Sequence, residues 1–174
     1  MTKISFRCTP LIVLIFLVVV AVPTLSLADS AVTVPAGTVI LVKMQSAVVT
    51  GEAKKGDPFT AVLEKSVTVD GRAVFPRGAK AYGLVLEAVE KGNISGRPAI
   101  GIHLVEIETD NGKVSIKTLS QGFVGTTQGT VNKITAGATT GQGGADAMLT
   151  SSGDVAIKAG GLIEFSLVDA VVVE

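Results

Sequence analysis

The chain has 174 residues, of which 47% are hydrophobic, 17% charged and 4% aromatic, and its formal net charge is zero. Disordered segments carry high charge and few apolar residues, so this composition excludes a disordered tail. It also excludes a nucleic-acid binder of the usual kind, because no excess of positive charge is present to neutralise phosphates.

Residues 1–28 have the pattern of a secretory signal peptide. Lys3 and Arg7 form a positive region, residues 11–22 form an apolar run, and small residues lie at the −3 and −1 positions of a site after Ala28. The run is short for a membrane span. We therefore predict cleavage after Ala28 and a periplasmic or cell-envelope location, with a retained N-terminal anchor as the alternative.

The predicted mature chain, residues 29–174, contains no cysteine, because the single cysteine of the sequence is Cys8. An exported protein without disulfides must gain its stability from burial. A chain of this length can bury roughly 68–70% of its unfolded surface, which is enough for one core. We expect a single domain with no further membrane span.

Short runs of valine, isoleucine and threonine dominate this part of the chain, and closely spaced glycines and prolines separate them. These residues favour strands, and no window of ~11 residues shows a convincing helical period. The pattern is typical of an all-β domain. We predict a single modified β-barrel of about seven to nine mostly antiparallel strands.

One turn pattern recurs along the chain, with an apolar residue first and glycine fourth. It occurs as Val34-Pro35-Ala36-Gly37, Phe75-Pro76-Arg77-Gly78 and Ile157-Lys158-Ala159-Gly160. Proline second and glycine fourth match a type I turn. The third copy is expected to be less rigid, because lysine does not fix φ as proline does.

The first and third copies belong to a longer internal match between residues 32–49 and 155–172. Alternation places the apolar residues of each copy on one face of a sheet: Ile40, Val42 and Met44 in one, Ile163, Phe165 and Leu167 in the other. We interpret the copies as two equivalent strands, neighbours that bring the chain ends together and close a barrel. The alternative is that valine-rich strands resemble each other by composition.

Between these copies the chain resembles a meander. The expected strands are 58–64, 67–69, 73–75, 79–89, 99–107 and 113–118. Asp70-Gly71 and the turn ending at Gly112 predict hairpins. Gly83 lies inside the longest expected strand, and an interior glycine indicates a bulge or a sharp bend.

Residues 121–153 break the strand pattern, since seven glycines fall within residues 122–144. One interpretation is a flexible surface insertion with a short helical piece near residues 145–150. The other is an assembly element that becomes ordered against a partner chain or the outer membrane.

The residues predict no catalytic site, no metal site and no cofactor. His103 is the only histidine, and alternation with Ile102 and Leu104 places it on the solvent-facing side of its strand rather than in the role of a base. Zinc needs about four ligands of recognisable spacing. The isolated aspartates, which are Asp57, Asp70, Asp110 and Asp146, are expected to bond to turns.

The residues also argue against nucleotides and nucleic acids as partners. The glycine-rich stretch lacks the Gly-Lys-Ser/Thr that places a lysine on phosphates. The basic residues are scattered, Lys54-Lys55 is the only doublet, and few aromatic side chains are available for base stacking.

The order of turns resembles the C-terminal β-barrel of the TrbI/VirB10 family. The residues that carry the resemblance are Val34–Ile40, Gly56–Ala61, Val67–Gly71, Phe75–Ala79, Gly83, Gly92, Gly96-Arg97 and Asp110–Lys113. The resemblance implies a bacterial envelope scaffold of conjugation or type IV secretion machines, not an enzyme, whose partners are envelope proteins or further copies. It also implies that 121–153 takes the place of the family's antenna toward the outer membrane, although this stretch is glycine-rich and polar.

Two other functions stay open at the level of sequence. A stand-alone periplasmic module could bind a small ligand or a glycan at the barrel mouth with the help of residues 121–153, although few aromatic residues are present for sugar stacking. A hydrolase acting through two carboxylates would need them ~5–9.5 Å apart across a cleft, which a sequence does not show.

Overall fold

A computed structural model of the chain describes residues 31–90, 97–126, 130–135, 138–142, 147–149 and 153–173. Ala31–Glu174 forms one compact unit. The described residues contain strands and turns, and none of their segments is a helix that could cross a membrane. The predicted signal peptide and its cleavage site lie outside the described residues.

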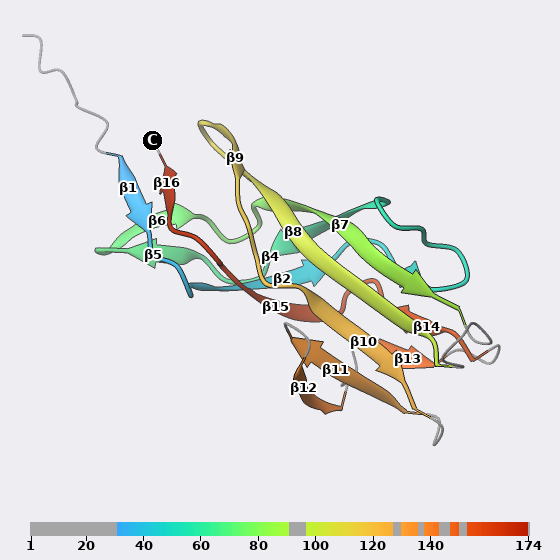
Figure 1. The fold of residues 1–174 in the computed structure, drawn as a ribbon. Coiled ribbons are helices and arrows are strands. Elements are labelled where there is room, and N and C mark those ends of the chain that lie inside the picture. The colour runs from blue at the N-terminus through green and yellow to red at the C-terminus, as the bar shows by residue number, and fades with distance from the viewer. Residues whose placement is uncertain are drawn as a thin grey trace, which may run out of the picture. The chain divides into compact units, whose positions relative to one another are not determined.

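Figure 1 labels the strands in chain order. They are β1 (Val32–Val34), β2 (Val39–Met44), β3 (Val48–Val49), β4 (Pro58–Leu63), β5 (Val67–Val69), β6 (Arg72–Phe75), β7 (Lys80–Val89), β8 (Ala99–Thr109), β9 (Gly112–Ser115), β10 (Gln121–Gly125), β11 (Val131–Thr135), β12 (Ala138–Gln142), β13 (Ala147–Leu149), β14 (Val155–Ile157), β15 (Leu162–Ser166) and β16 (Val171–Val173).

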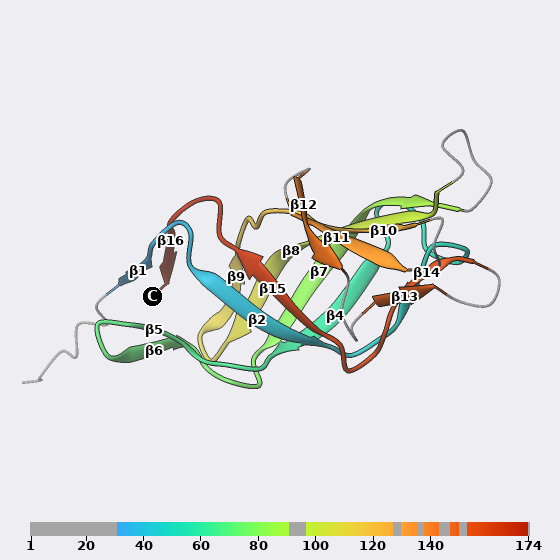
Figure 2. The ribbon, with the colours of Figure 1, turned by 90° about the horizontal axis from the view of Figure 1, so that it is seen from below.

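The large antiparallel sheet has the order β12-β11-β10-β8-β7-β4-β2-β15, and β9 also pairs with β8. The sheet curls, as both ribbon views show (Figures 1 and 2). Its two sides meet where Thr118 forms an isolated bridge with Leu167. Beside the bridge, the Leu119 N–H donates to the Ser166 carbonyl over 2.9 Å. The prediction of an all-β modified barrel is confirmed.

The core follows from the alternation of each strand. In β2 and β15 every second side chain is buried, and Ile40, Ile163 and Phe165 are at most 1% exposed. Apolar side chains from β4, β7, β8 and β10 join them in one cluster. The inner face of the sheet is therefore a packed hydrophobic core.

The internal sequence match corresponds to paired strands. β2 and β15 are antiparallel neighbours, with Leu41 opposite Glu164 at the centre. β1 pairs with β16, and β14 pairs with β3, in the same register after a shift of 123 residues: Thr33 is opposite Val172, and Ala156 is opposite Val49. The two copies are therefore related by a local two-fold symmetry in the structure. Similar composition alone does not explain the sequence match between them.

The recurring turns lie one residue later than expected, and a fourth copy occurs at Lys54–Asp57. The turns are Pro35–Thr38, Lys54–Asp57, Pro76–Ala79 and Lys158–Gly161, each closed by the N–H of its last residue to the carbonyl of its first. Glycine is third in each, with φ between 80° and 92°. A positive φ at the third position defines a type II turn, so the type I expectation is wrong.

These turns clamp pairs of strands reciprocally. The Gly37 N–H donates to the Leu167 carbonyl over 2.8 Å, and the Gly160 N–H donates to the Met44 carbonyl over 2.7 Å. In the same way, the Gly56 N–H donates to the Val85 carbonyl on β7, and the Gly78 N–H donates to the Leu63 carbonyl on β4. Each turn is therefore anchored on the strand that its partner turn leads into.

Residues 121–153, expected as a flexible insertion, contain β10, β11, β12 and β13. β10 pairs with β8, with Phe123 opposite Ile100, and β11 and β12 extend the sheet. A helical piece near 145–150 was expected, but residues 147–149 form β13. The open edge of β8 supplies backbone partners, which outweigh the low strand propensity of glycine.

Candidate functional site

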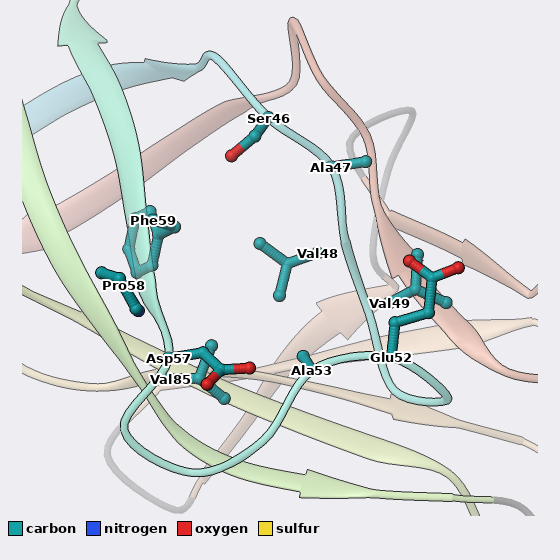
Figure 3. Close-up of a pocket in the computed structure, with 10 residues that line it drawn as sticks. All are labelled: Ser46, Ala47, Val48, Val49, Glu52, Ala53, Asp57, Pro58, Phe59 and Val85. Carbon is teal, nitrogen blue, oxygen red and sulfur yellow. The ribbon is translucent and has the colours of Figure 1, made fainter.

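A pocket of about 190 Å³ lies between the loop after β2 and the start of β4 (Figure 3). Its lining residues are Ser46, Ala47, Val48, Val49, Glu52, Ala53, Asp57, Pro58, Phe59 and Val85. The floor consists of the apolar residues Val48, Phe59 and Val85, which are only 2–7% exposed, so the accessible lining of the pocket is mainly polar. Figure 3 shows the Val48 side chain pointing across the pocket toward Phe59.

Gly83 makes room for the floor of this pocket. A Cβ at position 83 would collide with the Phe59 ring and would lie 2.5 Å from the His103 carbonyl oxygen. The register of β7 against β8 shifts between Tyr82 and Gly83, where the interior glycine predicts a bulge. The absence of a side chain on β7 therefore lets the Phe59 ring lie against the sheet.

The loop that walls the pocket is tied down at two points. Thr50, which is 1% exposed, donates its N–H to the Val155 carbonyl over 3.0 Å and bonds through Oγ1 to Asp154 Oδ1 at 3.2 Å. The Asp57 carboxylate accepts the Lys54 N–H at 2.8 Å, within the turn. The wall is consequently fixed to the start of β14, and Asp57 has the turn-bonding role that its position predicts.

The size of the pocket limits what it can hold. Ligand sites for small molecules usually measure ~300–1,000 Å³. A cavity of ~150 Å³ is enough for a benzene molecule. A volume of about 190 Å³ is therefore small for a cofactor and closer to the size of one side chain of a partner protein.

A second hollow, of about 310 Å³, lies between the Pro76–Ala79 turn and the end of β8. Three of the charged side chains that line it are paired: Arg77 contacts Glu64 at 2.8 Å, and Lys80 Nζ lies 3.6 Å from Glu108 Oε2. Solvent-exposed pairs of this kind contribute little to stability. The hollow presents neither an apolar floor nor an excess of one charge.

A polar network covers the adjacent outer face of β7, β8 and β9. The Tyr82 hydroxyl donates to Glu108 at 2.8 Å, and this bond, followed by the charge of Lys80, holds the pKa of Glu108 below its usual value. Lys113 bonds to Glu106 at 3.2 Å, which raises the pKa of Lys113, and its Nζ lies 4.2 Å from the centre of the Tyr82 ring. The network is a solvated surface feature.

His103 lies on the face of β8 opposite Ile102 and Leu104, as alternation predicts, but it is half-buried rather than fully solvent-facing. Its Nδ1 atom is buried and makes no hydrogen bond within the described part of the chain. Leu84 on β7 is its cross-strand neighbour, and cross-strand side chains on one face shield each other. Among the described ranges, no group of three or more metal-ligating side chains occurs.

The predicted turn residues are distributed around the sheet and do not converge on one site. Pro35, Gly37, Pro76, Gly78 and Gly160 belong to the reciprocal turns. Gly71 follows Asp70 between β5 and β6, and Gly112 joins β8 to β9, both with positive φ. Asp110 adjoins the second hollow, and Asp146 lies outside the described residues.

Three features of the structure were not predicted from the sequence. The first is the Lys54–Asp57 turn, which lacks proline. Its Gly56 lies seven residues before Leu63, whose carbonyl accepts the N–H of the partner turn, and the other copies have the same spacing. Thr50 and Thr118 are buried polar residues that bond to distant strands. No local pattern distinguishes these threonines from the exposed ones, because their partners are far away in the sequence.

No family model and no curated protein sequence matches this chain. Among solved structures, the chain is similar to ComB10 of the Com type IV secretion system of Helicobacter pylori, with 13% sequence identity and a TM-score of 0.49. The match covers 79% of this chain and 88% of the other.

Proposed function

We propose that this protein is an exported β-barrel of the bacterial cell envelope that acts without catalysis, through protein contacts, as a scaffold or assembly subunit similar to TrbI/VirB10 proteins. The observation that carries the proposal is the contrast between a filled interior and open strand edges. The inner face of the sheet is packed with apolar side chains. The terminal strands of the sheets, in contrast, have one edge without a described strand partner.

Two small ribbons provide such edges. β1 pairs with β16, and β5 pairs with β6, each as a two-stranded sheet. β12 ends the large sheet on one side. The edge of a strand presents unpaired N–H and C=O groups, and proteins recognise extended segments by adding a strand there. This geometry favours recognition of protein segments over binding of a small molecule.

Residues 1–28 support the export part of the proposal, with cleavage after Ala28 and a periplasmic or envelope location. The proposed partners are envelope proteins or further copies of the chain, and no cofactor is needed. The stretch 121–153 is proposed to contact a partner or the outer membrane. The support for this is that its strands β10–β12 form the outer end of the large sheet.

The test expresses the complete chain with its own N-terminal segment in a bacterial envelope. We expect N-terminal sequencing to find the mature chain beginning at Asp29, and fractionation to place it in the envelope. Chemical cross-linking of intact cells is expected to give defined complexes larger than one chain. A soluble cytoplasmic protein, or an envelope monomer without cross-linked species, would contradict the proposal.

The ligand-binding alternative is tested on the same preparation. A ligand that binds the native state raises its stability. We expect a thermal-shift screen of small envelope metabolites and glycans to leave the melting temperature unchanged, because the larger hollow lacks an apolar floor and the other pocket is small. A clear, saturable rise would replace the scaffold proposal with the binding module.

A further inference from the structure

We infer that the outer edge of β1 accepts a third antiparallel strand from a partner protein, in the position that β13 occupies beside β14. The inference rests on the proposed function and assigns it a contact surface. It follows from the internal equivalence of the two ends of the chain. One copy of the repeated unit has its third strand, and the other copy lacks one among the described residues.

The equivalence is exact in register. β1 and β16 pair with Val32 opposite Val173 and Val34 opposite Val171. β14 and β3 pair with Ile157 opposite Val48. This pair corresponds to Val34 opposite Val171, because Ile157 lies 123 residues after Val34 and Val48 lies 123 residues before Val171. In the second unit, β13 lies on the free side of β14, with Met148 opposite Ala156. The corresponding place in the first unit is opposite Thr33 on β1.

Hydrogen bonds in the second unit define which backbone groups point outward. The Thr50 N–H donates to the Val155 carbonyl, so the Val155 backbone faces β3. Neighbouring residues of a strand direct their backbone groups to opposite sides, so Ala156 faces β13. By equivalence, the backbone of Val32 faces β16, and the N–H and C=O of Thr33 face the outer edge.

The outer edge of β1 has no strand partner in the described structure, although β5 contacts β1. β1 and β16 form a two-stranded sheet, and no described strand pairs with the other edge of β1. Figure 1 shows β16 along one side of β1 only. Val34 is fully buried, whereas Thr33 is exposed, so the ribbon has one face on the core and the other face toward solvent.

The second unit also indicates the chemistry of the missing strand. β13 has the sequence Ala-Met-Leu, with Ala147 opposite Ile157 and Leu149 opposite Val155. Those two positions of β14 are fully buried. A strand on β1 would place its flanking residues opposite Val34 and Val32. The partner segment is therefore extended, with apolar residues on both sides of the one that bonds Thr33.

The first experiment uses the full chain and a capped peptide, Ala-Asp-Ala-Met-Leu-Thr-Ser, which copies residues 145–151. The free chain is expected to exchange the Thr33 amide hydrogen rapidly. A peptide concentration of about ten times Kd is expected to slow that exchange about tenfold. The matched control peptide carries an N-methylated methionine, which keeps every side chain but removes the N–H that would reach the Thr33 carbonyl.

The second experiment compares Thr33→Pro with Thr33→Val in cells. Proline is tolerated on an edge strand where the missing N–H would face outward, so β1 should keep its bonds to β16 while strand addition is blocked. Valine keeps the N–H. We expect Thr33→Pro, and not Thr33→Val, to lower the amount of envelope complex that chemical cross-linking detects at least fivefold.

The outcomes separate the inference from the proposed function. A Thr33 amide that is already protected in the free chain overturns the inference. So does unchanged exchange at about 5 mM peptide, a concentration in the millimolar range expected for short linear segments. Protection that rises with the concentration of the chain alone also overturns it, because a second copy then fills the edge. Unchanged complexes in Thr33→Pro refute the β1 edge and leave the scaffold function standing. Absence of complexes in the wild type refutes the scaffold function itself.

Discussion

Gly37 and Gly160, which are 123 residues apart, occupy equivalent places in one reciprocal contact. The Gly37 N–H donates to the Leu167 carbonyl at the end of β15, and the Gly160 N–H donates to the Met44 carbonyl at the end of β2. Each turn thus closes on the strand that the other turn begins. The two ends of the chain form one unit, and contacts of such long sequence separation make folding slow.

Both turn glycines should tolerate alanine poorly and to a similar degree. Gly37 has φ of +80° and Gly160 has φ of +83°, and alanine in the left-handed region costs about 1–2 kcal/mol. No atom lies within 4 Å of a Cβ built on Gly37, so the cost there is purely conformational. Urea denaturation of Gly37→Ala and Gly160→Ala measures it. The exposed neighbour variant Ala36→Ser serves as the control, and an equal loss in that variant would count against the explanation.

Gly83→Ala should destabilise the barrel for a steric reason. The new methyl group would meet the Phe59 ring and the His103 carbonyl, and overpacking of this kind costs about 1–3 kcal/mol or more. Gly101→Ala on the adjacent strand is the matched control, because its nearest neighbour would be 3.7 Å away. Thermal unfolding should show a clear drop in Tm for Gly83→Ala only. Similar melting of the two variants would show that β7 and β4 adapt easily.

Thr118 stabilises the point at which the two sides of the sheet meet. Its Oγ1 accepts the Leu104 N–H at 3.0 Å, and the residue is 6% exposed. Thr118→Val keeps the shape but leaves that N–H without a partner, which should cost about 1–3 kcal/mol. Thr118→Ser keeps the hydroxyl and should lose less. The order of the two unfolding free energies is the measurement, and a valine variant as stable as the serine variant would refute this role.

The Tyr82–Glu108 bond predicts a pH effect of known sign. The pKa of Glu108 is lower in the folded chain, first because of the Tyr82 hydroxyl and next because of Lys80. A lowered folded pKa gives stability above the unfolded pKa, and that stability is lost as pH falls through the folded pKa. Tyr82→Phe should raise the pKa of Glu108 and reduce the loss of stability at acid pH.

Carboxyl NMR titration of Glu108 measures this shift directly. Lys80→Met is the comparison variant, because it removes both the charge and the hydrogen bond of Lys80 and leaves the tyrosine bond. It should also raise the pKa of Glu108, because both contributions of Lys80 lower that pKa. An unchanged pKa of Glu108 in Tyr82→Phe would contradict the role of the tyrosine bond.

Local patterns predicted many elements of the fold correctly. Alternation in residues 39–44 placed Ile40, Val42 and Met44 on one buried face, because side chains of a strand point alternately to its two sides. Asp70-Gly71 identified the β5–β6 hairpin through the positive φ that the turn needs. The interior Gly83 marked a bulge. Each of these depends on steric rules that act between near neighbours in the sequence.

The pocket and its wall were not predictable in this way. Phe59 reaches the pocket floor because Gly83 on another strand leaves space for its ring. Thr50 holds the wall through Asp154 and Val155, about a hundred residues later, at a sequence separation of 104–105. The strands of 121–153 likewise exist because β8 offers an edge. Such contacts depend on where distant segments meet.

The strand class, the buried faces and the position of the turns to within one residue follow from local residue patterns. The frame of the turns depends on tertiary contacts. In a type I turn over residues 34–37, the Gly37 N–H would donate to the Val34 carbonyl. This N–H donates to the Leu167 carbonyl instead, and the turn closes one residue later, from the Thr38 N–H to the Pro35 carbonyl. Steric rules act within a few residues, whereas the partner of a backbone N–H is chosen by the whole fold.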